Sequence, residues 1–294
     1  MVKIDNLKTE NRNVNTENLD TLSIYEILKI MNKEDQNVLS TINDALKDIE
    51  KLIEKTIETY NNGGRIVYIG AGTSGRLGLM DAVEVVPTFN SDRFVGLIAG
   101  GSNAFIKAKE NVEDSKELCV EDLKSINFSN KDFLIGIAAS GRTPYVIGGI
   151  EYAKSLNALT GCVVCNKSSE IGKIVDYPIE VDAGSEVLTG STRLKSGTCQ
   201  KLILNMISTC TMIGVGKVYK NLMVDVKATN EKLYERCRRI VMMATDCSYE
   251  TADNTLKETN NNCKQAIVMI LLNKNKEEAI KSLSEANGFI RKAK

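Results

Sequence analysis

Two short loops rich in glycine and hydroxyl side chains are the first candidates for chemistry in this 294-residue chain. Residues 70–75 read Gly-Ala-Gly-Thr-Ser-Gly and lie between an apolar run and a predicted helix. Backbone N–H groups at a helix start, together with hydroxyl groups such as those of Thr73 and Ser74, suit a phosphate or a sugar. We therefore predict an anion-binding loop that includes Gly72, Thr73 and Ser74.

The same stretch has the Gly-x-Gly-x-x-Gly spacing of a dinucleotide-binding loop, so a dehydrogenase is an alternative. The next predicted strand ends at Gly100 and Gly101, with no acidic residue placed to bind a ribose. A tight turn from strand to helix that binds no ligand is a second alternative. The two hydroxyl groups of the loop favour a phosphate or sugar site over a dinucleotide site.

A second loop repeats this chemistry at Ser140, Gly141, Arg142 and Thr143, again between an apolar run and a predicted helix. Hydroxyl groups around a glycine, with a guanidinium beside them, form another possible cradle for an anion. Ligands of open α/β sheets bind at the carboxyl ends of the strands. Two such loops at that edge are therefore stronger support for a phosphate site than either loop alone.

A third polar segment, residues 184–198, comes just before an apolar helix and contains small residues, hydroxyl groups and charges. Polar loops of this kind are disproportionately binding or catalytic segments. The alternative is a solvated loop that caps the helix through Ser196 or Thr198. The candidate ligand-binding residues in this segment are Glu186, Ser191, Arg193 and Lys195.

Carboxylates complete the set of reactive candidates. Asp81 and Glu84 are three residues apart on the helix predicted after the first loop, and Glu110 and Glu113 have the same spacing on the next predicted helix. Most acidic residues on helices are solvated, so residue type alone selects none of the four. The chain has no histidine, which excludes Ser-His-Asp and Cys-His catalysis and any His-ligated metal. Acid–base work is left to Glu, Asp, Lys, Tyr or Cys.

Apolar runs alternate with helical patterns along most of the chain. The predicted strands are 65–69, 94–98, 132–138, 159–165 and 177–181. The predicted helices are 24–60 with a break at 32–35, 75–85, 104–123, 145–155 and 197–215. This alternation indicates an α/β fold with a doubly wound, mostly parallel sheet and N-terminal helices. Short helical patterns follow, so we expect a domain at 1–228 and a small helical domain at 229–294.

Composition restricts the partners and the compartment. A formal net charge of zero provides no global attraction for nucleic acid or an anionic membrane, and no apolar run is long enough to cross a bilayer. The eight cysteines are scattered, and Cys162 and Cys165 lie inside an apolar strand, which predicts core positions and no metal site. The polar first residues lack the apolar stretch of a signal peptide. A cytoplasmic location is expected.

These segments together resemble the N-acetylmuramic acid 6-phosphate etherase family, which has the sugar-isomerase (SIS) fold. The matching stretches are 68–78, 81–84, 87–88, 96–101, 136–145, 190–195, 221–226, 228–232 and 288–292. The stretch 190–195, Gly-Ser-Thr-Arg-Leu-Lys, is also a signature of glucokinase regulatory proteins. The resemblance implies a phosphosugar substrate, a homodimer and no cofactor.

The resemblance also assigns two catalytic carboxylates. The family's Asp-Ala-x-Glu segment places one on Glu84, and its Glu-x-x-Glu-Asp segment places the other on Glu113. The implied reaction cleaves the D-lactyl ether of N-acetylmuramic acid 6-phosphate by elimination and hydration, with Glu84 as the acid and Glu113 as the base. The chain departs from the family pattern beside these positions, at Val83, Val85, Val86, Asn111 and Val112.

Two further alternatives stay open from the sequence. A non-catalytic sugar-phosphate sensor of the glucokinase regulatory type needs neither Glu84 nor Glu113. An aldose–ketose phosphosugar isomerase uses similar phosphate loops, but it does not require etherase-like segments along the whole chain.

Overall fold

The computed structural model describes residues 7–107, 109, 111–228 and 230–294. It divides into two compact units, one made of residues up to 82 with 93–208 and the other made of 83–92 with 209–294. The predicted division of the chain into 1–228 and 229–294 stays a prediction.

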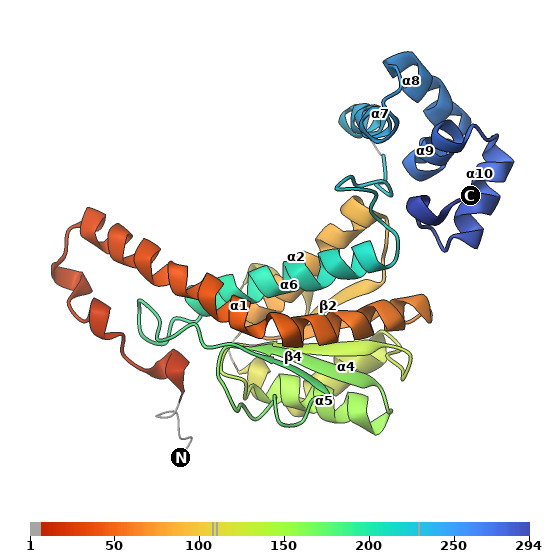
Figure 1. Ribbon diagram of the computed structural model, residues 1–294. Helices are drawn as coiled ribbons and strands as arrows, with labels where there is room; N and C mark the ends of the chain where they lie inside the picture. The colour runs from red at the N-terminus through yellow and green to blue at the C-terminus, as the bar shows by residue number, and fades with distance from the viewer. Residues whose placement is uncertain (1–6, 108, 110, 229) are drawn as a thin grey trace. The chain divides into compact units, whose positions relative to one another are not determined.

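The first unit contains a five-stranded parallel sheet with the strand order β2-β1-β3-β4-β5 (Figure 1). The strands are β1 (Ile66–Gly70), β2 (Phe94–Ile98), β3 (Phe133–Ala138), β4 (Leu159–Val164) and β5 (Tyr177–Glu180). From β1 the chain passes to β2 on one side and then returns to β3 on the other side of β1. The predicted parallel α/β fold is confirmed, and its topological switch point lies between β1 and β3.

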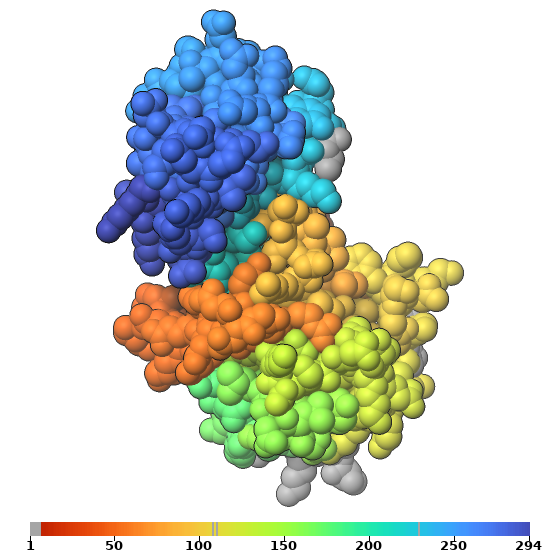
Figure 2. Space-filling view, turned by 90° about the vertical axis from the view of Figure 1, so that its right-hand side faces the viewer, coloured from red at the N-terminus to blue at the C-terminus, as the bar shows by residue number. Residues whose placement is uncertain are grey.

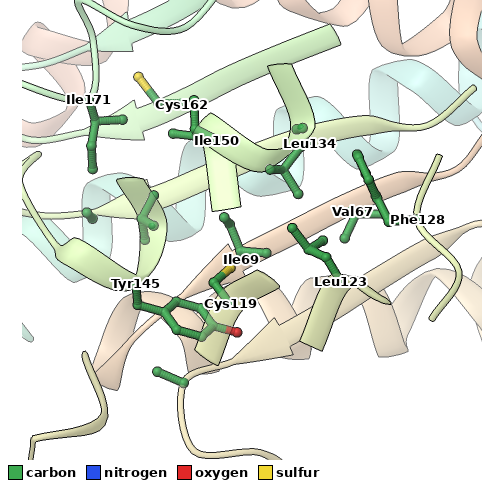
Figure 3. Close-up of a cluster of buried hydrophobic side chains, with 14 of the residues drawn as sticks. Val67, Ile69, Cys119, Leu123, Phe128, Leu134, Tyr145, Ile150, Cys162 and Ile171 are labelled. Carbon is green, nitrogen blue, oxygen red and sulfur yellow. The ribbon is translucent and has the colours of Figure 1, made fainter. Parts of the chain in front are cut away.

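Two helices, α4 (Lys116–Ser125) and α5 (Pro144–Ser155), cover one face of the sheet. They lie side by side on the surface of the first unit, in yellow-green in Figure 2. The side chains of Val67, Ile69 and Leu134 point from the strands into the buried cluster under these helices (Figure 3). The strands read as continuous apolar runs because both of their faces are covered.

The opposite face of the sheet packs against α1 (Ile24–Asn61) and the first turns of α2 (Gly72–Phe89). A Cβ added at Gly78 of α2 would lie 2.7 Å from Cδ1 of Ile137 on β3, so the helix approaches the sheet closely. The helix α1 buries one stripe of side chains at helical spacing, which are Glu34, Val38, Ile42, Ala45, Ile49, Leu52, Thr56 and Thr59.

The prediction of a break at residues 32–35 is wrong, because α1 runs without interruption for 38 residues. No proline or glycine lies between Ile24 and Asn61, and a capping box formed by Ser23 and Glu26 starts the helix. Polar residues suggested the break, but one of them, Glu34, is on the buried stripe and is held by partners inside the unit. From residue 7 onward, where the described chain begins, three single 3₁₀ turns precede α1, at Lys8–Glu10, Val14–Thr16 and Leu19–Thr21.

The prediction of a single helix at 104–123 is also wrong. The structure has α3 (Ser102–Ile106), a 3₁₀ turn η4 (Val112–Asp114) and α4. Asn111 adopts a left-handed conformation with φ of 65°, which interrupts any helix at that point. The hydroxyl of Ser115 then accepts a hydrogen bond from the backbone N–H of Leu118 and starts α4 as its N-cap.

The second unit contains the predicted C-terminal helices. They are α7 (Glu231–Thr245), α8 (Tyr249–Glu258), α9 (Cys263–Leu272) and α10 (Lys276–Glu285), followed by a 3₁₀ turn, η5 (Ile290–Lys292). Each of the four helices begins at an Asn or Ser whose side chain accepts a backbone hydrogen bond. The helix α6 (Lys195–Gly214) leads into this unit. Among the described residues, no helix combines the length and the apolar character needed to cross a membrane.

Candidate functional site

The two hydroxyl-rich loops follow neighbouring strands at the switch point of the sheet. Strands β1 and β3 are hydrogen-bonded in parallel, and Gly70 at the end of β1 pairs with Ile137 near the end of β3. The loops that begin at Ala71 and Ala139 therefore leave the same edge of the sheet next to each other. Open α/β sheets bind ligands in the crevice at this position.

The first loop turns directly into α2, which begins at Gly72. A Cβ at Gly75 would lie 2.5 Å from the carbonyl oxygen of Gly70, so only glycine permits this tight turn. The N–H groups at the start of an α-helix lack acceptors within the helix and form an anion site. Ser74 is buried, and its hydroxyl donates to Oε1 of Gln200 on α6 at 2.9 Å. In this arrangement the loop offers an anion its backbone N–H groups and the hydroxyl of the half-buried Thr73.

The second loop has a similar construction. Gly141 has φ of 71°, and a Cβ there would lie 2.4 Å from Cβ of Ser169. Thr143 is the N-cap of α5, but its side chain makes no capping hydrogen bond, and Pro144 takes the first helical position. Ser140, Arg142 and Thr143 are half-buried at the start of the helix. Nη2 of Arg142 lies 3.9 Å from Oε1 of the exposed Glu170.

Ser140→Ala is expected to weaken binding of a phosphorylated sugar by about tenfold or more, because a hydroxyl hydrogen bond to a charged group contributes roughly 1–3 kcal/mol. Isothermal titration with the phosphosugar measures the change. The matched control is Ser155→Ala at the other end of α5, where the hydroxyl donates to the carbonyl oxygen of Tyr152. Equal affinities of Ser140→Ala and wild type would place the phosphate elsewhere.

Glu186 is completely buried, and its carboxylate forms hydrogen bonds within the segment 184–198. It accepts hydrogen bonds from the backbone N–H groups of Lys195 and Ser196 at 2.8 and 2.9 Å, and from the Ser196 hydroxyl at 2.8 Å. These are the first N–H groups of α6, where a negative charge is stabilised by the helix dipole. Glu186 thus anchors the start of α6, and its predicted contact with a ligand stays a prediction.

The ammonium group of Lys195 is also buried inside the first unit. It lies 2.8 Å from Oε2 of Glu34 on α1, and the two side chains are 1% and 8% exposed. Glu34 also accepts hydrogen bonds from the side chains of Asn13 and Asn15. Burial alone raises the pKa of Glu34, but the hydrogen bonds from Lys195, Asn15 and Asn13 and the lysine charge outweigh it, so the pKa lies below its usual value. Glu34 thus holds two parts of the chain against α1, the start of α6 through Lys195 and the segment before α1 through Asn13 and Asn15.

Between Glu186 and Lys195 the segment is more open. Arg193 is exposed and Ser191 is half-buried, and the backbone N–H of Ser191 donates to the carbonyl oxygen of Leu188. Of the four residues predicted in this segment, these two are accessible to a ligand, whereas Glu186 and Lys195 make their hydrogen bonds within the chain.

The two candidate catalytic glutamates are both exposed. Glu113 lies in the 3₁₀ turn η4 of the first unit, and Glu84 lies on α2 in the part of that helix that belongs to the second unit. Glu110 is outside the described residues. The structure therefore does not place the two carboxylates relative to each other, and their catalytic roles stay predictions.

Asp81, three residues before Glu84, has a very different environment. Its side chain is buried, and Oδ1 accepts hydrogen bonds from Nδ2 of Asn205 at 3.0 Å and from the hydroxyl of Ser208 at 3.1 Å. Burial raises the pKa of Asp81 to about 6, against the opposing effect of the hydrogen bonds from Ser208 and Asn205 and of the nearby Tyr68 hydroxyl. The spacing alone put Asp81 and Glu84 on one helix face, but the structure turns one inward and the other outward.

Proteins of similar sequence show which family this chain belongs to. A family model described as the glucokinase regulatory protein N-terminal SIS domain matches residues 48–154. Over 292 residues, the chain is 54% identical to the N-acetylmuramic acid 6-phosphate etherase of Bacillus cytotoxicus and 57% identical to N-acetylmuramic acid 6-phosphate etherase 2 of Enterococcus faecalis. Each alignment covers 99% of both chains. The chain belongs to the N-acetylmuramic acid 6-phosphate etherase family.

Membership of the etherase family confirms the resemblance predicted from the sequence. The match to the regulatory-protein model ends at residue 154, whereas the etherases align along the whole chain, so the sensor alternative is not favoured. A solved phosphoheptose isomerase from Francisella tularensis is similar in fold, with a TM-score of 0.50 and 17% identity over 65% of this chain and 98% of that one. At this identity the comparison supports the SIS fold alone.

Sequence reasoning missed several polar residues that hold α1, α2 and α6 in place around the candidate site. Glu34 was placed in a predicted break, although it lies four residues before Val38 on the apolar stripe of α1, a signal that a helical wheel shows. Gln200 and Asn205 are in a helix that reads as apolar nearly all round. Their partners, Ser74 and Asp81, are more than 120 residues away in sequence, so no local pattern could connect them.

No group of three or more Cys, Asp or Glu side chains within the described ranges is arranged to hold a metal ion. The cysteines Cys162 and Cys165 are buried, as predicted for core positions.

Proposed function

We propose that this chain cleaves the D-lactyl ether of N-acetylmuramic acid 6-phosphate, giving N-acetylglucosamine 6-phosphate and D-lactate as a carbon–oxygen lyase. The observation that carries the proposal is the 54–57% identity to etherases over 99% of the chain. The two hydroxyl-rich loops at the switch point support a phosphosugar as the ligand.

The sugar 6-phosphate binds at the loops after β1 and β3. The backbone N–H groups at the start of α2, the hydroxyl groups of Thr73, Ser140 and Thr143, and the guanidinium of Arg142 supply hydrogen bonds and positive charge to the phosphate. Gly72 and Gly141 keep the backbone free of side chains where it turns toward this edge. Ser191 and Arg193 are the accessible polar groups of the segment before α6, and they contact the remainder of the substrate.

The reaction needs an acid and a base and no redox step. Ring opening exposes the aldehyde at C1, which acidifies the proton on C2. Glu113 removes that proton, and Glu84 protonates the lactyl oxygen as the bond from C3 to this oxygen breaks. D-lactate leaves, and an unsaturated aldehyde remains. Water then adds at C3 as C2 is reprotonated, so the net change is one water consumed for each ether cleaved.

Two further properties belong to this proposal. We propose that the enzyme is a homodimer, as the family resemblance implies, and that α1 contributes to the contact because Tyr25, Leu28 and Leu39 are 57–67% exposed on it. We also propose a cytoplasmic location, supported by eight cysteines that are all free thiols.

The direct test is incubation of the purified chain with N-acetylmuramic acid 6-phosphate and enzymatic measurement of released D-lactate. Stoichiometric release of D-lactate and N-acetylglucosamine 6-phosphate is expected. Tight binding of the phosphosugar with no lactate would instead indicate a sensor of sugar phosphates.

A further inference from the structure

A polar ladder joins α2 to α6 inside the first unit. At the start of α2, Ser74 donates to Gln200, and two turns later Asp81 accepts from Asn205 and Ser208. Such bonds strongly constrain the relative position of the two helices, because a buried polar group that loses its partner is not compensated by water. The ladder therefore fixes both the axial position and the rotation of α2 where it leaves the phosphate loop.

Asp81 is the member of this ladder that has a buried ionisable side chain, with 6% of the residue exposed. On the sheet side, the hydroxyl of the fully buried Tyr68 on β1 lies near enough to lower the pKa of Asp81. Neither this hydroxyl nor Oδ2 of Asp81 forms a hydrogen bond of good geometry within the described part of the chain. The carboxyl thus occupies a closed polar space between β1, α2 and α6.

No substrate can reach a group with this burial, but the next turn of the same helix presents Glu84 on the exposed side. One helical turn has a fixed geometry, so whatever holds Asp81 also sets the rotation of the turn that carries Glu84. Misplacing a reacting group by about 1 Å can lower a rate by roughly a hundredfold.

We propose that Asp81 is a positioning residue for the etherase reaction, whose carboxyl, held by Asn205 and Ser208, fixes the turn of α2 that presents Glu84. This inference rests on the proposed function. It assigns Asp81 a role through hydrogen-bond geometry, with no transfer of its proton to or from the substrate.

The groups near Asp81 that the structure describes come from β1 and α6. Tyr68 faces it from β1, Asn205 and Ser208 face it from α6, and Lys201 of α6 acts through its charge. Burial raises the pKa of the Asp81 carboxyl to about 6, so its charge changes within the pH range in which enzymes work. In either charge state Oδ1 keeps its acceptor role toward Asn205 and Ser208, and for this reason an amide can replace the acid.

The test compares Asp81→Asn with Asp81→Ala in the full-length chain, by D-lactate release over a range of substrate concentrations. The asparagine retains an acceptor at Oδ1, so its kcat is expected to stay within about fivefold of wild type. Alanine removes the acceptor, and its kcat is expected to fall by about 10². KM is expected to change by less than about threefold in both, because the phosphate loops are untouched.

A second variant, Asn205→Ala, tests the same contact from the α6 side if Asp81→Ala does not fold. It is expected to lower kcat by about tenfold with an unchanged KM. Where Asp81→Ala does fold, Asn205→Ala is expected to add little to it in the double variant. If Asp81→Asn is as inactive as Asp81→Ala, Asp81 acts through its charge or proton and the positioning role is overturned. If Asp81→Ala raises KM by the same factor by which it lowers kcat, the positioning role is overturned as well. A wild-type chain that releases no lactate would refute the proposed function itself, which is a separate outcome.

Discussion

Glu113→Gln is expected to lower the rate of D-lactate release by about 10² or more while leaving the protein folded. General acid–base catalysis contributes roughly 10²–10⁴ to a rate, and glutamine has the shape of glutamate but cannot accept a proton. Glu113 is exposed, and surface substitutions usually change the free energy of unfolding by less than about 0.5 kcal/mol. Loss of activity without loss of stability is therefore the expected combination.

Exchange of the C2 proton with solvent deuterium separates the roles of the two carboxylates. If Glu113 is the base, Glu113→Gln suppresses this exchange together with lactate release. Glu84→Gln is expected to slow lactate release by a similar factor and yet to retain exchange, because the proton on C2 is still removed. Mass spectrometry of substrate recovered from deuterated buffer measures this exchange.

The matched control is Glu121→Gln, an exposed glutamate on α4 that belongs to neither predicted catalytic segment. It is expected to keep the wild-type rate. If Glu84→Gln and Glu113→Gln also cleave at the wild-type rate with full exchange, the two-carboxylate mechanism is wrong. The reverse pattern, exchange lost in Glu84→Gln and kept in Glu113→Gln, would interchange the acid and the base.

The parts of the fold that could be predicted are those that depend on local patterns. Strand β2 was predicted at its observed bounds, 94–98, and the other strands within a residue or so, because buried parallel strands are continuous apolar runs. The positions of the two candidate anion loops could also be predicted, since each comes directly after such a run. The local pattern gave wrong predictions in two places. At 32–35 the polar Glu34 is buried in an ion pair within a continuous helix, and within 104–123 the left-handed Asn111 interrupts the helix.

Contacts between distant segments account for what could not be predicted about the site. Lys195 reads as a basic residue in a polar loop, which suits a phosphate ligand, but its partner Glu34 lies 161 residues earlier. Glu186 reads as a loop acid and is the buried anchor of α6. Asp81 reads as the companion of Glu84 and is turned to the interior. In each case the residue type shows which chemistry the side chain can do, whereas its surroundings depend on tertiary packing.

Breaking the buried Glu34–Lys195 pair on one side is expected to destabilise the protein by about 3–5 kcal/mol, because one charge is left uncompensated in the interior. Glu34→Gln leaves the ammonium group of Lys195 without its counterion, and Lys195→Met leaves the carboxylate of Glu34 with only the amides of Asn13 and Asn15. The double variant is expected to lose less than the sum of the two single variants, with a coupling energy of about 2 kcal/mol or more. Urea denaturation at pH 7 gives the three free energies of unfolding.

The exposed pair Lys47–Glu50 is the matched control, since its N–O distance of 2.9 Å is nearly the same as the 2.8 Å of the buried pair. Because its side chains are 86% and 56% exposed, solvent screens the two charges and its coupling energy is expected to be much smaller than that of the buried pair. Burial is thus the variable that the comparison isolates. A coupling energy for Glu34 and Lys195 as small as that of the exposed pair would contradict this account of the segment before α6.

The pH dependence of stability gives an independent check on the same pair. The folded-state pKa of Glu34 lies below its usual value of 4.5, so its contribution is fully present above that pH and is lost as the pH falls through the folded-state pKa. Wild type is therefore expected to lose stability relative to Glu34→Gln as the pH is lowered from about 6 toward 3. If the difference in free energy of unfolding between the two proteins stays constant over this range, Glu34 is not the ionised partner of Lys195 in the folded chain.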